Sequence, residues 1–256
     1  MLKSVLFSIS LGTIGLALVW TCDAAAPAKI AQVAPMSDLT AEADAKVKAL
    51  ETSLADNQSY LSSKGTTLPA DAGVLAVLAQ AVAESDEQAA WKPAAADVRD
   101  AAIALSNAKS YDDAKKELEA VKAAFGGKSG GAKPEHEWNK LCRLGLLMKE
   151  VNKRNTSVKR TLRKKPQPSD AEFAKAAADS SVLAVLALAA HDDTHEVKGQ
   201  KKEDIDEWQK YAKEFQAQMT VAAAAFAKKD LAGATEASKK GNAACNDCHG
   251  KFRKDE

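Results

Sequence analysis

The chain has 256 residues, a formal net charge of +1 and an aromatic content of only 5%. A charge this close to balance lacks the basic footprint of a nucleic-acid-binding domain. No run of alternating β-branched residues argues for a sheet. The length leaves room for two small domains after export processing, and abundant alanine lets helices approach closely. We therefore predict an all-α protein.

Residues 1–26 are typical of a secretory signal peptide. Lys3 supplies the positive start, residues 5–20 the apolar run and residues 24–26 a small-residue cleavage site. A retained membrane anchor is one alternative, because the apolar run is only a little short for a span. Lipid attachment at Cys22 is another. The expected location is the bacterial periplasm, with membrane anchoring if the signal is retained or lipidated.

Residues 27–36 are expected to form a mobile Pro/Ala tether, and residues 37–126 contain a first set of helices. Ser37 is a candidate N-cap, and Pro93 suits the first turn of the third helix. Four helices are predicted, at 37–63, 70–84, 93–108 and 112–125. The Gly-rich segment 127–134 then predicts a flexible linker and a domain boundary.

Residues 135–256 repeat this plan. The first helix is followed by a basic connection, and the last helix has apolar or small residues on one face. Four helices are predicted, at 136–153, 171–190, 204–227 and 230–253. The expected architecture is therefore two tandem four-helix bundles.

The two halves differ in charge. Residues 37–126 carry nine basic and fifteen acidic side chains, whereas residues 133–256 carry 24 basic and 19 acidic ones. The segment from Lys153 to Lys165 contains no acid. It could dock an acidic redox partner or anionic lipid headgroups, or it could be an ordinary solvated connection between helices.

Cys245, Cys248 and His249 form the Cys-x-x-Cys-His attachment signature of a c-type heme. One helical turn holds both thiols over the same edge of a porphyrin, where each can add to a vinyl group, and the histidine can ligate the iron. The alternatives are a disulfide, a zinc half-site or a redox pair. Zinc needs four ligands, and no second cysteine pair completes a site. A redox pair normally lies in a βαβ setting, which this chain lacks.

The motif continues as His249-Gly250-Lys251-Phe252-Arg253. On these residues the second half of the chain resembles the class II cytochromes c, the cytochrome c-prime family. Members are four-helix bundles with one heme attached near the C-terminus, commonly followed by His-x-x-Phe/Tyr-Arg. The resemblance implies a cytochrome c-prime-like C-terminal bundle with one covalent heme c on its last helix, held by Cys245 and Cys248 with His249 as axial ligand.

The halves are expected to be copies of each other. The sequence Val-Leu-Ala-Val-Leu-Ala occurs at 74–79 and again at 182–187, each time in the second predicted helix of its half. Aligning the last helices places Lys128 and Ser129 where Cys248 and His249 stand. The first half therefore lacks the means to hold a heme covalently, and we expect it to be a heme-less bundle.

The resemblance also implies that the first helix of the second bundle supplies the residue opposite the histidine. A methionine there gives a low-spin electron carrier, whereas an apolar residue gives a five-coordinate iron that binds nitric oxide or carbon monoxide. Family members often have an arginine four residues earlier, so Arg143 indicates Leu147. Two helical stripes compete: Trp138-Leu141-Gly145-Met148 and Leu144-Leu147-Val151. We predict Met148 as the iron ligand, with Leu147 as the distal-side alternative and ordinary core packing open for either.

The predicted function is one-electron transfer to or from a periplasmic or membrane redox partner protein. The alternative is a gas-binding heme protein. No acid, base or nucleophile constellation is visible in the sequence, so an enzyme is not expected. The resemblance leaves a homodimer open, because class II bundles often pair through their first two helices.

Overall fold

The computed structural model describes residues 29–253, and all regular secondary structure in that range is helical. The all-α prediction is confirmed. The expected signal peptide 1–26, Cys22 and the first residues of the expected tether lie outside the described range, so export and lipidation stay predictions.

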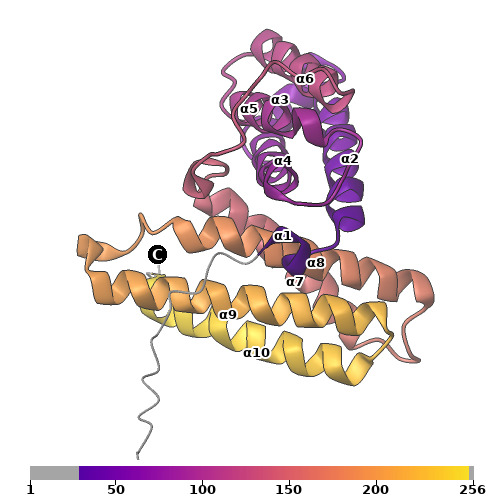
Figure 1. Ribbon diagram of the computed structural model, residues 1–256, viewed down its shortest axis with the longest axis vertical. Coiled ribbons are helices and arrows are strands. Elements are labelled where there is room, and N and C mark those ends of the chain that lie inside the picture. The colour runs from indigo at the N-terminus through magenta and orange to yellow at the C-terminus, as the bar shows by residue number, and fades with distance from the viewer. Residues whose placement is uncertain (1–28, 254–256) are drawn as a thin grey trace, which may run out of the picture.

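Most of the described helices form two groups. In Figure 1 the first group lies above the second, whose long helices run horizontally. In the first group, contacts run in a ring from α2 to α4, α5, α6 and back to α2. Its helices are α2 (Met36–Ser53), α3 (Asn57–Ser63), α4 (Thr67–Glu84), α5 (Ala95–Ser106) and α6 (Tyr111–Phe125), with a 3-10 turn, η1 (Lys92–Ala94), before α5.

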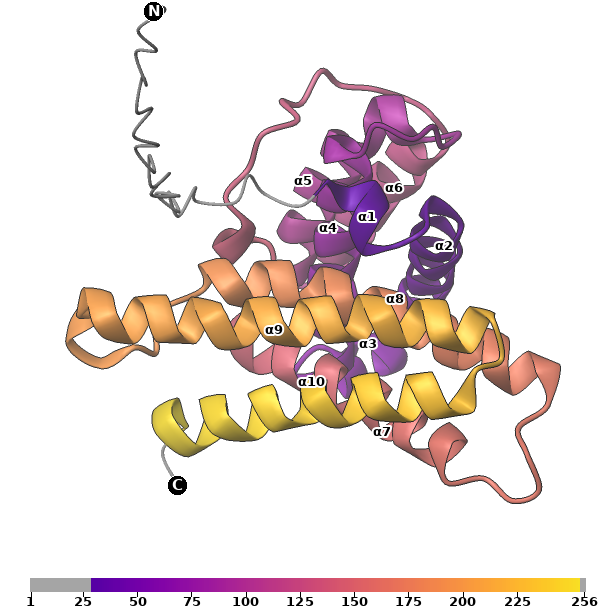
Figure 2. The same ribbon diagram turned by 60° about the horizontal axis from the view of Figure 1, so that its bottom comes forward.

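The second group also closes a ring of contacts, from α7 through α8 and α9 to α10 and back to α7. Its helices are α7 (Leu144–Leu162), α8 (Asp170–Asp192), α9 (Lys202–Ala227) and α10 (Leu231–Phe252), with 3-10 turns η2 (Trp138–Lys140) and η3 (Lys198–Gln200). Helices α8 and α9 pack closely, as do α9 and α10, whereas α10 and α7 touch at few points. Figure 2 shows α7 and α10 running in opposite directions.

Two predicted helices differ from the observed ones by more than a few residues. The single helix expected at 37–63 is broken after Ser53, because the Asp56 side chain caps a new helix by accepting a 2.7 Å hydrogen bond from the Ser59 amide. The helix expected at 136–153 begins only at Leu144, after Arg143 in an extended conformation, and continues to Leu162. The basic segment predicted as a connection is therefore mostly helix.

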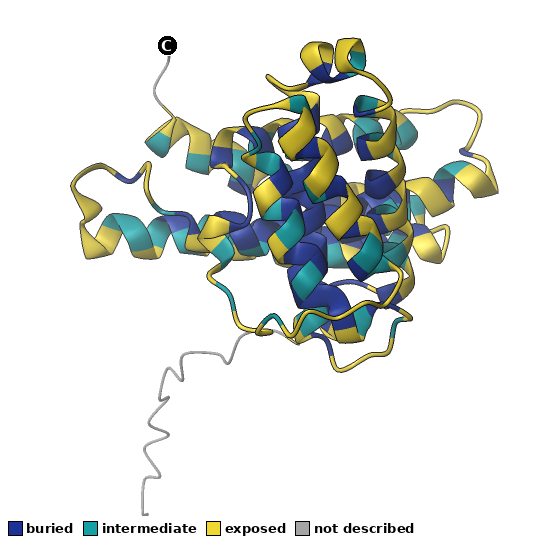
Figure 3. Ribbon diagram, turned by 90° about the horizontal axis from the view of Figure 1, so that it is seen from above, coloured by how far each residue is buried: buried dark blue, intermediate teal, exposed yellow. Residues whose placement is uncertain are grey.

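The core is centred on α4 and α8, which carry the two copies of the repeated hexapeptide. All residues of both copies are at most 2% exposed. Figure 3 shows the buried residues through the middle of the molecule and the exposed residues along outer helix faces. By length and hydropathy both helices could also span a membrane, but 78% of each apolar window is buried among other helices, as in a protein core.

The expected tether is packed from Ile30 onward. Ile30 and Val33 form a short helix, α1 (Ile30–Val33), and are 5% and 2% exposed. Thr220 on α9 donates a 2.9 Å hydrogen bond to the Val33 carbonyl. A mobile tether is thus wrong for residues 30–36, because apolar side chains at 30 and 33 are buried against α8 and α9.

The segment predicted as a flexible linker, 127–134, is held at its C-terminal end. The guanidinium of Arg99 is 2% exposed and donates 2.9 Å hydrogen bonds to the carbonyls of Lys133 and Pro134. Farther back in the segment, the Asp97 carboxylate accepts hydrogen bonds from Ser129 Oγ and Ala132 N. Its glycines at 127 and 131 have positive φ angles, which explains the Gly-rich composition.

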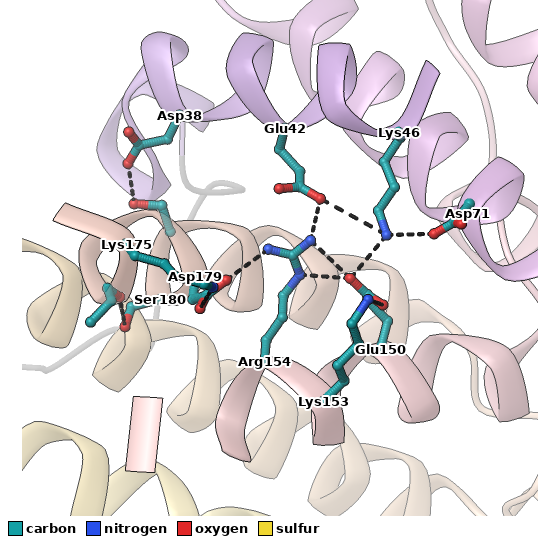
Figure 4. Close-up of polar contacts among 12 residues, drawn as sticks. Asp38, Glu42, Lys46, Asp71, Glu150, Lys153, Arg154, Lys175, Asp179 and Ser180 are labelled. Atoms are coloured by element: carbon teal, nitrogen blue, oxygen red, sulfur yellow. Dashed lines mark hydrogen bonds and ion pairs between the residues drawn. The ribbon is translucent and has the colours of Figure 1, made fainter. Parts of the chain in front are cut away.

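A buried ion network joins α7 to the first group of helices (Figure 4). Lys46 on α2 is 4% exposed, and its Nζ lies 2.7 Å from Asp71 Oδ1 on α4 and 3.0 Å from Glu150 Oε1 on α7. Arg154, one turn after Glu150, bonds Glu150 at 2.9 Å, Asp179 on α8 at 3.0 Å, and Glu42 on α2. Each buried charge therefore has opposite charges around it, as burial requires.

Because of this network, the free energy of unfolding should decrease at acid pH. Burial alone would raise the pKa of Glu150, but the charges of Lys46 and Arg154 and the Lys46 hydrogen bond lower it to about 2. A lowered pKa contributes stability that is complete above the ordinary value of 4.5 and is lost as pH falls toward 2. We expect Glu150→Gln to lower the free energy of unfolding by about 3 kcal/mol at pH 7. In urea unfolding at several pH values, this deficit should shrink steadily below pH 4.5; a deficit independent of pH would contradict the assignment.

Candidate cofactor-attachment site

The motif residues lie on the last turns of α10. Cys245 and Cys248 are half-buried and His249 is exposed. Both thiols are free. Asp230 caps the start of this helix by accepting a 2.9 Å hydrogen bond from the Gly233 amide, so the helix predicted at 230–253 forms as expected.

The thiols lie in an environment that favours their protonated form. Burial raises the pKa of Cys245 and of Cys248 to about 11, against an ordinary value of 9.0. The thiols of thioredoxin-like Cys-x-x-Cys pairs have lowered pKa values instead.

The imidazole of His249 is suited to act as a ligand. Partial burial of the ring, and then the charge of Arg253, lower its pKa below the ordinary 6.5. Both effects favour the neutral imidazole, whose nitrogen lone pair can bind a metal.

The end of α10 is fastened to α9 by contacts that the sequence reading missed. Lys251 Nζ lies 2.7 Å from Asp204 Oδ1 and also bonds Glu207. The rings of Phe252 and Trp208 meet edge to face at 5.4 Å between centroids. Asp204 and Glu207 lie one turn apart on α9, and Lys251 lies in the C-terminal tail. This arrangement of opposite charges could have predicted the contact from the sequence. These contacts fix the orientation of the turn that carries His249.

Gly241 sets how closely α10 approaches α9. A Cβ at this position would lie 2.6 Å from Met219 Cε and 3.4 Å from Phe215 Cδ2. A β-carbon added at Gly250 would have no neighbouring atom within 4 Å. A side chain at position 241 would therefore displace the buried Met219 side chain, whereas position 250 has room for one.

We expect Gly241→Leu to destabilise the chain by about 1–3 kcal/mol through overpacking. Gly250→Ala is the matched control; near the helix end it should stabilise slightly, by up to about 0.5–1 kcal/mol. Urea unfolding followed by circular dichroism measures both. Equal effects at the two sites would show that α9 and α10 are not tightly packed at 241.

A hydrogen bond sets the register of α7 against α10. Asn155 Nδ2 donates to Asn242 Oδ1 at 2.7 Å. Met148 is seven residues before Asn155, and His249 is seven residues after Asn242. Seven residues make two turns and return to the same helix side. Since α7 and α10 are antiparallel (Figure 2), ideal helix geometry puts Met148 and His249 at a similar level along the two helices.

Leu147 points elsewhere. It is 1% exposed and lies seven residues before Arg154, on the side of α7 that contacts α2 and α8. Met148 is half-buried. The structure therefore brings Met148, and not Leu147, to the side of α10. The stripe that included Trp138 and Leu141 does not explain this, because both residues precede α7.

The seam between α7 and α10 is loosely packed and partly polar. Asn155 Oδ1 and Ser238 Oγ are buried there without a hydrogen-bond partner in the described chain. Met148, Val151, Cys245 and Cys248 are all half-buried. Two surface hollows lie away from the motif, one beside His191 and one beneath α1. The motif thus borders a flank of the helices that is only partly buried.

The donor set along this seam fits a c-type heme. Two free thiols and an imidazole occupy consecutive turns of one helix, and Met148 lies on the side of the neighbouring helix that bears Asn155. Within residues 29–253, no group of three or more His, Cys, Asp or Glu is arranged to hold a bare metal ion. No protein-family model, curated protein or solved structure matches the chain.

Proposed function

We propose that the chain is a monoheme c-type cytochrome that transfers single electrons. The observation that carries the proposal is the Cys-x-x-Cys-His signature on the last turns of α10, next to the side of α7 that bears Asn155 and, two turns earlier, Met148. The ring of contacts among α7, α8, α9 and α10 supports a cytochrome c-prime-like bundle, and the ring in the first group supports a second, heme-less bundle.

Each residue has a definite role in this proposal. Cys245 and Cys248 would hold the heme through thioether bonds, His249 would be the proximal ligand, and Met148 the distal one. The heme itself would supply a one-electron change at its iron. Lys251 and Phe252 keep the imidazole oriented by fastening its turn to α9. The first bundle holds α7, and with it Met148, through the buried ion network.

An absorption spectrum tests the proposal and its main rival. The exported protein, made in a host that attaches heme, should give a low-spin, sulfur-ligated ferrous spectrum that carbon monoxide leaves unchanged. A high-spin spectrum that shifts with carbon monoxide would instead support gas binding. A colourless protein would contradict both.

Met148→Ala is expected to convert the iron from six-coordinate to five-coordinate, because alanine offers no ligand. The ferrous spectrum should become high-spin and sensitive to carbon monoxide. Leu147→Ala is the matched control: it should cost about 2–5 kcal/mol of stability by opening a core cavity, yet leave the spectrum low-spin. If Leu147→Ala alone changes the spin state, the distal assignment is reversed.

A further inference from the structure

Exposed cations form a stripe along α7. The stripe is continuous because α7 extends to Leu162, beyond its predicted end at 153. The stripe residues are spaced by three, four or seven positions, so they lie on one side of the helix and its C-terminal cap. All are exposed, and the stripe consists of Lys149, Lys153, Arg160, Arg163 and Lys164. From first to last it extends about 22 Å.

The stripe is poorly balanced by acids. Lys153 pairs with Glu150 at 3.6 Å and Lys164 pairs with Glu172. Lys149, Arg160 and Arg163 have no acidic oxygen within 4 Å anywhere in residues 29–253. On α2 and α9, by contrast, exposed lysines are interleaved with acids along the helix, as in the pairs Lys48–Asp44 and Lys202–Asp206. The α7 stripe therefore presents a field of one sign.

The stripe borders the proposed heme site. Lys149 directly follows Met148, and Lys159 lies between the stripe and α10. The charge of Lys159 is felt at the Cys245 sulfur, whose pKa it pulls down against the larger effect of burial. Positive charge thus surrounds the flank where electrons would enter or leave.

We propose that the α7 stripe docks an acidic face of a redox-partner protein. This inference rests on the proposed function, since it names the partner of the same site. Electron-transfer encounters use small interfaces and rely on opposite charges to steer association. A membrane surface fits less well, because interfacial helices add large apolar anchors to their basic face. The large exposed apolar residues of the described chain are Leu61 and Val221, on α3 and α9.

A triple variant tests the stripe: Lys149→Gln, Arg160→Gln and Arg163→Gln. The matched control neutralises three other exposed cations on a different face: Lys210→Gln, Lys213→Gln and Lys228→Gln. Two measurements are made at about 10 mM and about 0.15 M ionic strength, where the screening length is roughly 30 and 8 Å. The first is the rate of electron exchange between the heme-loaded protein and the anion hexacyanoferrate. The second is binding of a fluorescent oligoglutamate peptide, and of vesicles with anionic phospholipid, to chains with and without heme.

At low ionic strength the stripe variant should exchange electrons about ten-fold or more slowly than the control variant, and the difference should largely vanish at the higher ionic strength. It should also lose peptide binding that the control retains. Equal behaviour of the two variants overturns the proposal. So does binding to vesicles in preference to the peptide, which would assign the stripe to a membrane. If the chain takes up no heme, the proposed function fails, while the peptide measurement still decides whether the stripe binds acidic polypeptide.

Discussion

Replacing both motif cysteines, Cys245→Ser with Cys248→Ser, is expected to abolish covalent heme attachment completely. A serine hydroxyl does not form the thioether, so any heme taken up would be held by axial ligands alone and would be lost on denaturation. Heme staining of a denaturing gel and the mass of the intact chain measure the effect. Each single variant should retain one thioether and an intermediate yield.

Cys142 provides the matched control for these thiols. Its thiol is free, as in the motif cysteines, but the residue is only 5% exposed. It packs against Gly73 so closely that a β-carbon added at position 73 would lie 2.5 Å from Cys142 Sγ. Cys142→Ser should lower stability by burying a hydroxyl, yet leave the covalent heme in place. Covalent heme that persists in the double variant, or a wild-type protein that gains no mass, would contradict the assignment.

Lys46→Met is expected to cost about 3–5 kcal/mol in the free energy of unfolding. The methionine fills a similar volume but leaves Asp71 and Glu150 without their shared cation, and Glu150 is 5% exposed. Breaking one side of a buried ion pair costs more than the pair contributes, because Asp71 is left without a cation while Glu150 keeps only Arg154 nearby in the core. Urea unfolding at neutral pH measures the loss.

Lys48→Met is the matched control, two residues along the same helix. Lys48 pairs with Asp44 at 3.6 Å, but the two side chains are 75% and 57% exposed. Such a pair contributes little, so the variant should lie within about 0.5 kcal/mol of the wild type. Similar costs for the two lysines would mean that the first group of helices does not hold α7 as the structure indicates.

Periodicity predicted most helices correctly, because their apolar faces are continuous. It failed around α7 for a physical reason. The residues of 154–162 are mostly charged or polar, and from sequence alone such a stretch is indistinguishable from a solvated connection. Arg154 in particular is buried against Glu42 on α2, a residue 112 positions away. No local pattern could have indicated that partner.

The candidate site was predictable in part. Cys245, Cys248 and His249 are contiguous, so spacing alone grouped them. The choice between Met148 and Leu147 depended on where α7 begins and which of its sides meets α10, and the competing stripes could not decide it. The ion pairs of Lys251 with Asp204 and Glu207 were not predicted, because each of these residues resembles an ordinary surface charge in the sequence.

The loose packing between α7 and α10 bears on the order in which folding and heme attachment would occur. Helix α7 is fastened to α2 and α8 by charges, and α10 is fastened to α9 by ring packing and a lysine. Neither fastening crosses the seam, where the Asn155–Asn242 hydrogen bond joins the two helices. The two helices can therefore separate while each keeps its contacts with its other neighbours. In the proposed cytochrome, the heme would be inserted between them after the remaining helices have assembled.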